Sequence, residues 1–108
     1  MIARTWHCTA THDNAPRYIA HFQHAVLPEL RQLEGFQTGY AFRRNLGDVV
    51  EITVITMWES MDAIRRFAGD SVDTAVVAPE ARAILLSFDT TVTHAEVAVD
   101  SERPERQA

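Results

Sequence analysis

The chain has 108 residues, of which 46% are hydrophobic and 23% charged, values typical of one globular domain. Fifteen acidic residues against ten basic ones give a net charge of −5, which argues against a nucleic-acid-binding or anionic-membrane surface. No apolar run approaches the ~18 residues of a membrane span, so we expect no membrane association. A single cysteine, Cys8, excludes an internal disulfide and favours the reducing cytoplasm as the compartment.

The basic residues are all arginine, and the sequence contains no lysine. This excludes a lysine Schiff base and a P-loop. The four glycines never form the Gly-x-Gly-x-x-Gly pattern of dinucleotide-binding loops. The sequence therefore contains no recognisable nucleotide-binding loop.

The first segment, 2–9, is predicted to be a strand because it holds β-branched and aromatic residues and no Gly or Pro. One alternating set contains Ile2 and Trp6, which suit an interface. The other set is small and polar, and we expect it to face the helices: Ala3, Thr5, His7 and Thr9. Neither set is typical of a solvent-facing surface, so both faces of this strand should be covered.

A helix is predicted to start near Pro16 and to end at Gly35, because apolar residues recur at helical spacing between them. Pro28 lies inside this pattern and should kink or break the helix. Segments 36–46 and 49–58 are predicted to be strands joined in an antiparallel hairpin by a short Asn-Leu-Gly-Asp turn. Phe36, Thr38, Tyr40 and Phe42 are expected on one face.

The second half of the chain begins with a short helix, capped by Ser60 and ended by Gly69. Pro79 opens another short helix through Leu86. A fourth strand is predicted over 88–99. Residues 100–108 are polar and lack core-forming side chains, so we expect a disordered tail after one domain spanning 1–99.

This order, β-α-β-β-α-β, predicts an α+β fold of the ferredoxin-like type. One four-stranded sheet, with strand order 4-1-3-2, would carry its helices on a single face. The other face would expose an apolar set of side chains. A second copy of the chain is its expected cover, so we predict a homodimer.

Four segments in sequence resemble the antibiotic biosynthesis monooxygenase family: IARTWH, LPELRQLEGFQTGY, VITMWESMDAIRRFAGD and VVAPEARAILLSFDTTVTHAEV. The resemblance covers residues 1–99. It implies a dimeric α/β barrel with a ligand pocket between the sheet and the helices of each subunit. The family includes cofactor-free oxygenases of aromatic polyketides and quinols, and haem-degrading enzymes.

The haem-degrading branch of this family uses an Asn on the first strand, a Trp on the second helix and a His shortly after it. The corresponding positions here are His7, Phe67 and Val77. The resemblance therefore disfavours haem and implies a cofactor-free enzyme. Such an enzyme deprotonates a phenol or quinol, which then gives an electron directly to O₂. It needs a dry pocket, a base and hydrogen-bond donors for the oxyanion.

The candidate catalytic residues are His7 on the first strand and His94 on the fourth. Imidazole can act as a base or a ligand near neutral pH. The two strands should be neighbours, so the histidines could share one site if they point to the same face. Two histidines without a third ligand make a poor metal site, and we predict no metal. The alternative for His7 is a hydrogen-bonded structural histidine.

The candidate substrate-binding residues are aromatic: Tyr18, Phe22, Trp58 and Phe67. Aromatic side chains beside a pocket can stack on an aromatic substrate, and a tyrosine adds a donor. The alternative for each is ordinary core packing. His21 and His24 share a helix face that is offset from the apolar stripe, so we expect both in solvent. Cys8 is expected to be a small apolar residue at the dimer interface.

Three functions remain compatible with these residues. The first is a cofactor-independent monooxygenase that uses O₂ on an aromatic, phenolic or quinol-like small molecule. The second is a haem- or metal-binding relative using His7 or His94. The third is a non-catalytic dimeric binder of a small apolar ligand.

Overall fold

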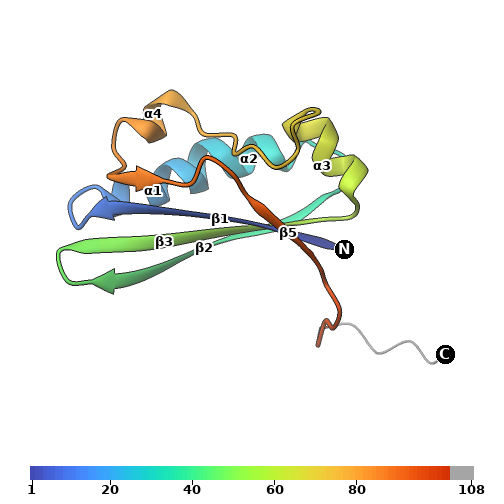
Figure 1. Cartoon of the computed structure of the whole chain (residues 1–108), viewed down its shortest axis with the longest axis horizontal. Helices are drawn as coiled ribbons and strands as arrows, with labels where there is room; N and C mark the ends of the chain where they lie inside the picture. Colours follow the sequence, from blue (N-terminus) through green and yellow to red (C-terminus); the bar gives the residue numbers. More distant parts are fainter. Residues whose placement is uncertain (103–108) are drawn as a thin grey trace.

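The computed structural model describes residues 1–102. Helices gather on one face of an antiparallel sheet and leave the other face open (Figure 1). The strands are β1 (Ile2–Thr11), β2 (Phe36–Leu46), β3 (Val49–Trp58), β4 (Ser87–Phe88) and β5 (Thr93–Glu96). The helices are α1 (Ala15–His21), η1 (Phe22–Val26), α2 (Leu27–Leu30), α3 (Met61–Ala68) and α4 (Pro79–Arg82).

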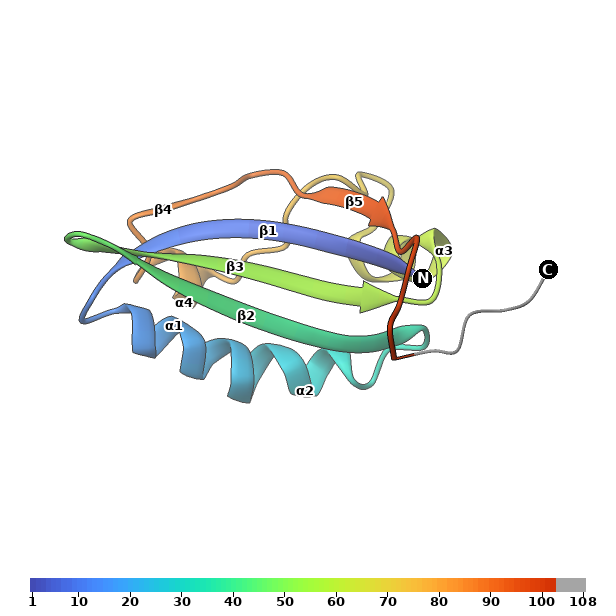
Figure 2. The same cartoon turned by 90° about the horizontal axis from the view of Figure 1, so that it is seen from below.

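The strands follow the order β2-β3-β1, with β4 and β5 both paired to the far edge of β1 (Figure 2). Strands β2 and β3 form the predicted hairpin, and β1 pairs antiparallel with β3 along its whole length. The expected order 4-1-3-2 and the ferredoxin-like fold are confirmed. The first and last strands of the motif are therefore neighbours.

The fourth strand is shorter than predicted and interrupted between β4 and β5. Residues 90–92 leave the ladder to pair with the chain before α4, where Thr74 bridges Thr91 and the Val92 N–H donates to the Asp73 carbonyl at 2.8 Å. The Trp6 indole N–H donates to the Asp89 carbonyl at 2.7 Å. These bonds satisfy backbone groups that a continuous strand would have paired with β1.

The first helix passes through Pro28 without breaking. Its five residues before Leu27 form a π-helical turn, in which the Leu27 N–H donates to the Phe22 carbonyl. A proline cannot donate the usual helical hydrogen bond, and the wider turn re-routes the bonds immediately before it. Helix α4 ends at Arg82, earlier than predicted, and Ser60 caps α3 by accepting from the Ala63 N–H at 3.2 Å.

Burial alternates along the central strands and identifies their two faces. In β3 the buried residues are Val50, Ile52, Val54, Thr56 and Trp58. In β1 the helix-facing residues are Arg4, Trp6, Cys8 and Ala10, whereas His7 is exposed. The predicted orientation of β1 is therefore wrong. Trp6 is large and packs beneath α1, and the small, polar set lies on the open face.

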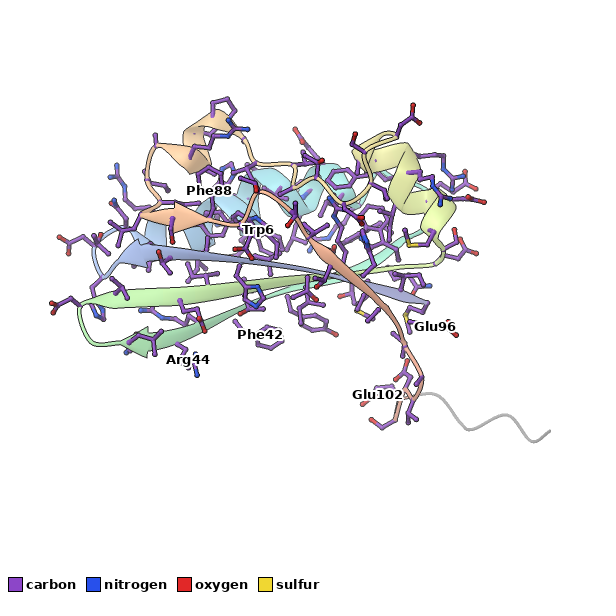
Figure 3. The ribbon with its side chains drawn as sticks, viewed as in Figure 1. Trp6, Phe42, Arg44, Phe88, Glu96 and Glu102 are labelled. Carbon is purple, nitrogen blue, oxygen red and sulfur yellow. The ribbon has the colours of Figure 1, made fainter. Side chains whose placement is uncertain are left out.

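A register shift between Phe36 and Thr38 changes the faces of β2. Phe36 packs edge-on against Trp58 on the helix side, with ring centroids 5.3 Å apart. Tyr40 and Phe42 lie on the open face, and Figure 3 shows Phe42 and Arg44 projecting away from the helices. The expectation that Phe36 shares their face is wrong, because the bulge at Gln37 shifts the alternation by one residue.

Residues 97–102 continue past β5 away from the sheet (Figure 1). The predicted tail, 100–108, lies largely outside the described residues, since only 100–102 are described. Within residues 1–102, no helix has the length and apolar character needed to cross a membrane.

Candidate functional site

A cavity of about 80 Å³ lies between the helix-facing side of the sheet and helix α1. Its walls come from β1, β3, the α1–α2 helix, α3 and the segment before α4. The lining residues are Arg4, Trp6, Tyr18, His21, Phe22, Val26, Leu30, Val54, Thr56, Phe67, Ala75, Val76, Val77, Ala78, Ala81 and Val92. Figure 3 shows Trp6 between β1 and the helices, where it forms part of this wall.

Aromatic rings form two groups around the cavity. On one side Tyr18 lies between Trp6 and His21, with ring centroids 5.8 and 5.9 Å apart. On the other side Phe67 stacks on Trp58 at 5.3 Å. Flat apolar walls of this kind suit an aromatic ligand.

The cavity is small, and its rim is irregular. Engineered cavities that take benzene measure about 150 Å³, so a single ring would require the rim to yield. Four successive lining residues, 75–78, lie outside helices and strands. Val76 among them is 58% exposed. This segment therefore contains the part of the wall that is most open to solvent.

Arg4 brings a buried positive charge to the cavity wall. Its side chain is only 5% exposed. The guanidinium donates to the carbonyls of Val72 at 2.7 Å and Thr74 at 3.0 Å, and lies 5.7 Å from the centre of the Phe67 ring. Burial lowers the pKa of Arg4, and the charge of Asp73 partly offsets this. A guanidinium nevertheless stays protonated in proteins.

His94 lies behind Arg4 rather than in the cavity wall. Its Nε2 is 3.0 Å from Nη1 of Arg4, and its Nδ1 is 3.2 Å from the Asp73 carboxylate. An arginine can only donate, so Nε2 accepts, and Nδ1 carries the proton and donates a hydrogen bond to the Asp73 carboxylate. Burial lowers the pKa of His94, Arg4 lowers it further, and Asp73 opposes the shift. The neutral imidazole is therefore the form that fits.

Tyr18 and His21 present polar groups to the cavity. Tyr18 is 5% exposed, and within residues 1–102 its hydroxyl makes no hydrogen bond. Burial raises the pKa of Tyr18, with a smaller contribution from Cys8, so the hydroxyl stays a donor. His21 also lacks a hydrogen-bond partner in that part of the chain and is half-buried, contrary to the expected exposure. His24 is exposed as predicted.

His7 lies on the open face of the sheet, away from this cavity. Its side chain is about half exposed, and Nδ1 is 3.3 Å from the Asp89 carboxylate. His94 pairs with Arg4 across β1 and β5, on the helix side. The two histidines therefore lie on opposite faces and do not share a site. The misplacement follows from the wrong face assignment of β1.

The predicted aromatic residues divide into lining and supporting groups. Tyr18, Phe22 and Phe67 line the cavity. Trp58 is fully buried behind Phe67, and its indole N–H donates to Thr56 Oγ1 at 2.9 Å. Cys8 lies in the core rather than at an interface. Burial, followed by Asp89, raises the pKa of its thiol to about 12, so it is no nucleophile at neutral pH.

Neither predicted histidine is placed to ligate a haem iron in this cavity. Both ring nitrogens of His94 are engaged by Arg4 and Asp73, and His7 lies on the other face. The cavity is also far below the size of ordinary cofactor pockets, about 300–1,000 Å³. Among residues 1–102, no cluster of three or more His, Cys, Asp or Glu side chains could hold a metal ion.

Sequence reasoning missed Arg4, Trp6 and His21 as cavity residues. Arg4 occupies an alternating position between Ile2 and Trp6, so an inward Trp6 requires an inward Arg4. A charged residue in an otherwise apolar strand set was the available signal. His21 precedes Phe22 in the helix, and only the packing of α1 on the sheet shows that its ring reaches the cavity edge.

Comparison with solved structures identifies proteins of the same fold. No protein-family model and no curated protein matches the sequence. A proposed antibiotic biosynthesis monooxygenase from Bacillus cereus is 14% identical with a TM-score of 0.62, covering 97% of this chain and 98% of its own.

Two further structures of this fold belong to proteins whose described activities differ from each other. The haem-degrader MhuD from Mycobacterium tuberculosis is 18% identical with a TM-score of 0.63, covering 93% of this chain and 98% of its own. SnoaB from Streptomyces nogalater, a cofactor-independent oxygenase, is 20% identical with a TM-score of 0.53, covering 96% and 98%. The chain thus has the fold of antibiotic biosynthesis monooxygenases, as its sequence resemblance implies.

Proposed function

We propose that this protein is a small cofactor-independent monooxygenase that oxidises a phenolic or quinol-like aromatic molecule in the cavity beneath α1. The observation that carries the proposal is the combination of aromatic walls with unpartnered polar groups on Tyr18 and His21. A fold shared with the cofactor-independent oxygenase SnoaB is consistent with this chemistry.

The substrate supplies every electron that the reaction needs. Loss of the phenolic proton makes a ring carbon electron-rich, and that carbon passes one electron to O₂. The resulting radical and superoxide combine to a peroxide, which takes up the proton. Loss of water across the ring C–H then leaves a carbonyl. Phenol and O₂ thereby give a quinone and water, with one of the two O₂ atoms in each product.

The cavity residues have distinct roles in this scheme. His21 is the base, because it is the lining imidazole without a partner among residues 1–102. The Tyr18 hydroxyl donates to a substrate oxygen. Phe22 and Phe67 hold the ring, and Trp58 supports Phe67 from behind. His94 does not touch the substrate in this arrangement and acts through Arg4.

The cavity is smaller than one that takes benzene, so a single ring enters only as the rim yields. Oxygen uptake with a substituted hydroquinone or catechol, in the presence of a chelator and without flavin, tests the proposal. We expect uptake that requires folded protein and yields the hydroxylated quinone, which carries one oxygen atom from O₂. Binding without oxygen uptake would indicate the non-catalytic binder instead. A Soret band on adding haemin would support the haem-binding alternative.

We also propose that the protein is a homodimer through the open face of its sheet. Tyr40, Phe42 and Leu46 on this face are 49%, 52% and 42% exposed. The Tyr40 and Phe42 rings stack with centroids 5.8 Å apart. A second copy would cover these side chains together with Ile55 and Met57 of β3.

A further inference from the structure

Arg4 is a buried cation whose hydrogen-bond partners are all neutral. Three of its five N–H groups donate, to the Val72 and Thr74 carbonyls and to the imidazole of His94. Two N–H groups are left without a partner among residues 1–102. A buried charge normally pairs with an opposite charge, because desolvation is costly.

No carboxylate balances this charge inside the cavity. Within the described part of the chain Arg4 forms no ion pair, and no Asp or Glu lines the cavity. Asp73 forms no ion pair with Arg4: its carboxylate binds His94, which in turn accepts from Arg4, and its charge acts on Arg4 at longer range. Its side chain is 75% exposed, so solvent screens much of its charge. One wall of an apolar cavity is therefore positive.

We propose that Arg4 receives an ionised oxygen of the ligand, so that the cavity binds an aromatic molecule as its phenolate or carboxylate anion. An anion here would pair with the buried guanidinium through a charge-assisted hydrogen bond. The ring would lie over Phe67, which the guanidinium already approaches. This inference rests on the proposed function only in taking the ligand to be aromatic.

His94 and Asp73 hold the guanidinium in place for this role. The Asp73 carboxylate fixes the His94 tautomer, and Nε2 then accepts from Nη1 of Arg4. With Nη1 engaged by His94 and Val72, rotation of the guanidinium would break two hydrogen bonds. The unpartnered N–H groups are thereby kept in a fixed direction.

Binding of chromogenic ring compounds tests the inference without O₂ or turnover. The ligands are 4-nitrophenolate, 4-nitrobenzoate and the neutral 4-nitroanisole, titrated anaerobically with the full-length protein. We expect at least one anion to bind more tightly than 4-nitroanisole. Arg4→Met should weaken binding of that anion roughly 10–100-fold, the scale of a hydrogen bond to a charged group, and leave 4-nitroanisole unchanged. Arg4→Lys should retain the preference for the anion.

The two anions distinguish a phenol from a carboxylic acid as the source of the charge. Equal or tighter binding of 4-nitroanisole to the wild-type protein would overturn the inference even if Arg4→Met does not fold. Anion-selective binding without oxygen uptake from any phenol would retain the inference and reject the monooxygenase. Oxygen uptake without a preference for the anion would reject the inference and retain the monooxygenase.

Discussion

At the scale of single residues, the polar chemistry of this cavity depends on three side chains in different environments. Arg4 is buried and charged, Tyr18 is buried and neutral, and His21 lies at the edge. His94 makes no direct contribution to the cavity wall but contacts Arg4. The residue that takes the proton and the residue that holds the charge are thus different, so they can be tested separately.

Replacement of the two histidines should separate base catalysis from a surface role. His21→Asn removes the proposed base, and we expect oxygen uptake to fall ~10²–10⁴-fold while the protein stays folded. His7→Asn is the matched control, because His7 lies on the opposite face beside Asp89. Its rate per folded molecule should be unchanged. A large loss in the His7 variant alone would place the reaction on the open face.

The stability of the protein should depend on pH through His94. Burial and Arg4 lower its pKa in the folded state, so the unfolded chain takes up the proton first as the pH falls. Its contribution to stability is complete above the unfolded value, about 6.5, and is lost as the pH falls below that value. Melting temperatures from pH 8 to 5 should therefore fall more steeply for wild type than for His94→Gln.

Glutamine is the appropriate replacement because its amide can still accept from Arg4 and donate to Asp73 without titrating. The two proteins share every other side chain, so only the difference between the two curves reports on His94. Parallel curves would show that the neutral His94 does not contribute to folding in this way.

At the scale of elements, the sequence predicts most helices and strands, because their signals are local. The hairpin turn, the Ser60 cap and the Gly69 stop are each specified by a few adjacent residues. The faces of β1 and β2 were misassigned because they depend on distant contacts. Trp6 requires space beneath α1, and the bulge at Gln37 is invisible in the alternation of the strand itself.

The sequence likewise predicts only part of the candidate site. The aromatic helix positions Tyr18 and Phe22 follow from helical spacing, and both line the cavity. Arg4 could not be assigned, because its burial depends on carbonyls that are supplied 68 and 70 residues further along the chain. Such long-range compensation of a buried charge leaves no local pattern.

A side chain at Gly35, in the junction between α2 and β2, should lower the stability of the protein. This glycine has φ +89°, and an added Cβ would lie far inside van der Waals contact with the Cβ of Ala63 on α3. Gly47 is the matched control, since its φ is +60° and nothing lies near its added Cβ. Both alanine variants incur backbone strain. Gly35→Ala should lose a further ~1–3 kcal/mol in the free energy of unfolding through overpacking.

Urea unfolding of the two variants measures this difference directly. Equal losses would mean that α3 shifts freely, and the loop would then not fix α3 against the sheet. Since Phe67 on α3 forms part of the cavity wall, a rigid junction also positions the proposed site.

At the scale of the whole molecule, the helices cover one face of the sheet and leave the other open. The cavity is built entirely within one chain, so ligand binding does not require the open face. Dimerisation and catalysis should therefore be separable by mutation. The open face exposes large apolar residues of β2 to solvent.

Phe42→Glu should dissociate the proposed dimer. Phe42 stacks on Tyr40 and projects from the open face, so an interface there would bury the new charge without a partner (Figure 3). In sedimentation equilibrium at micromolar concentration, we expect wild type at twice the 12.2 kDa of one chain and the variant at or near the monomer mass. Ala20→Glu, an exposed position on α1, adds the same charge on the helix side and should leave the dimer intact. A monomeric wild type, or dissociation by both substitutions alike, would contradict assembly through the sheet.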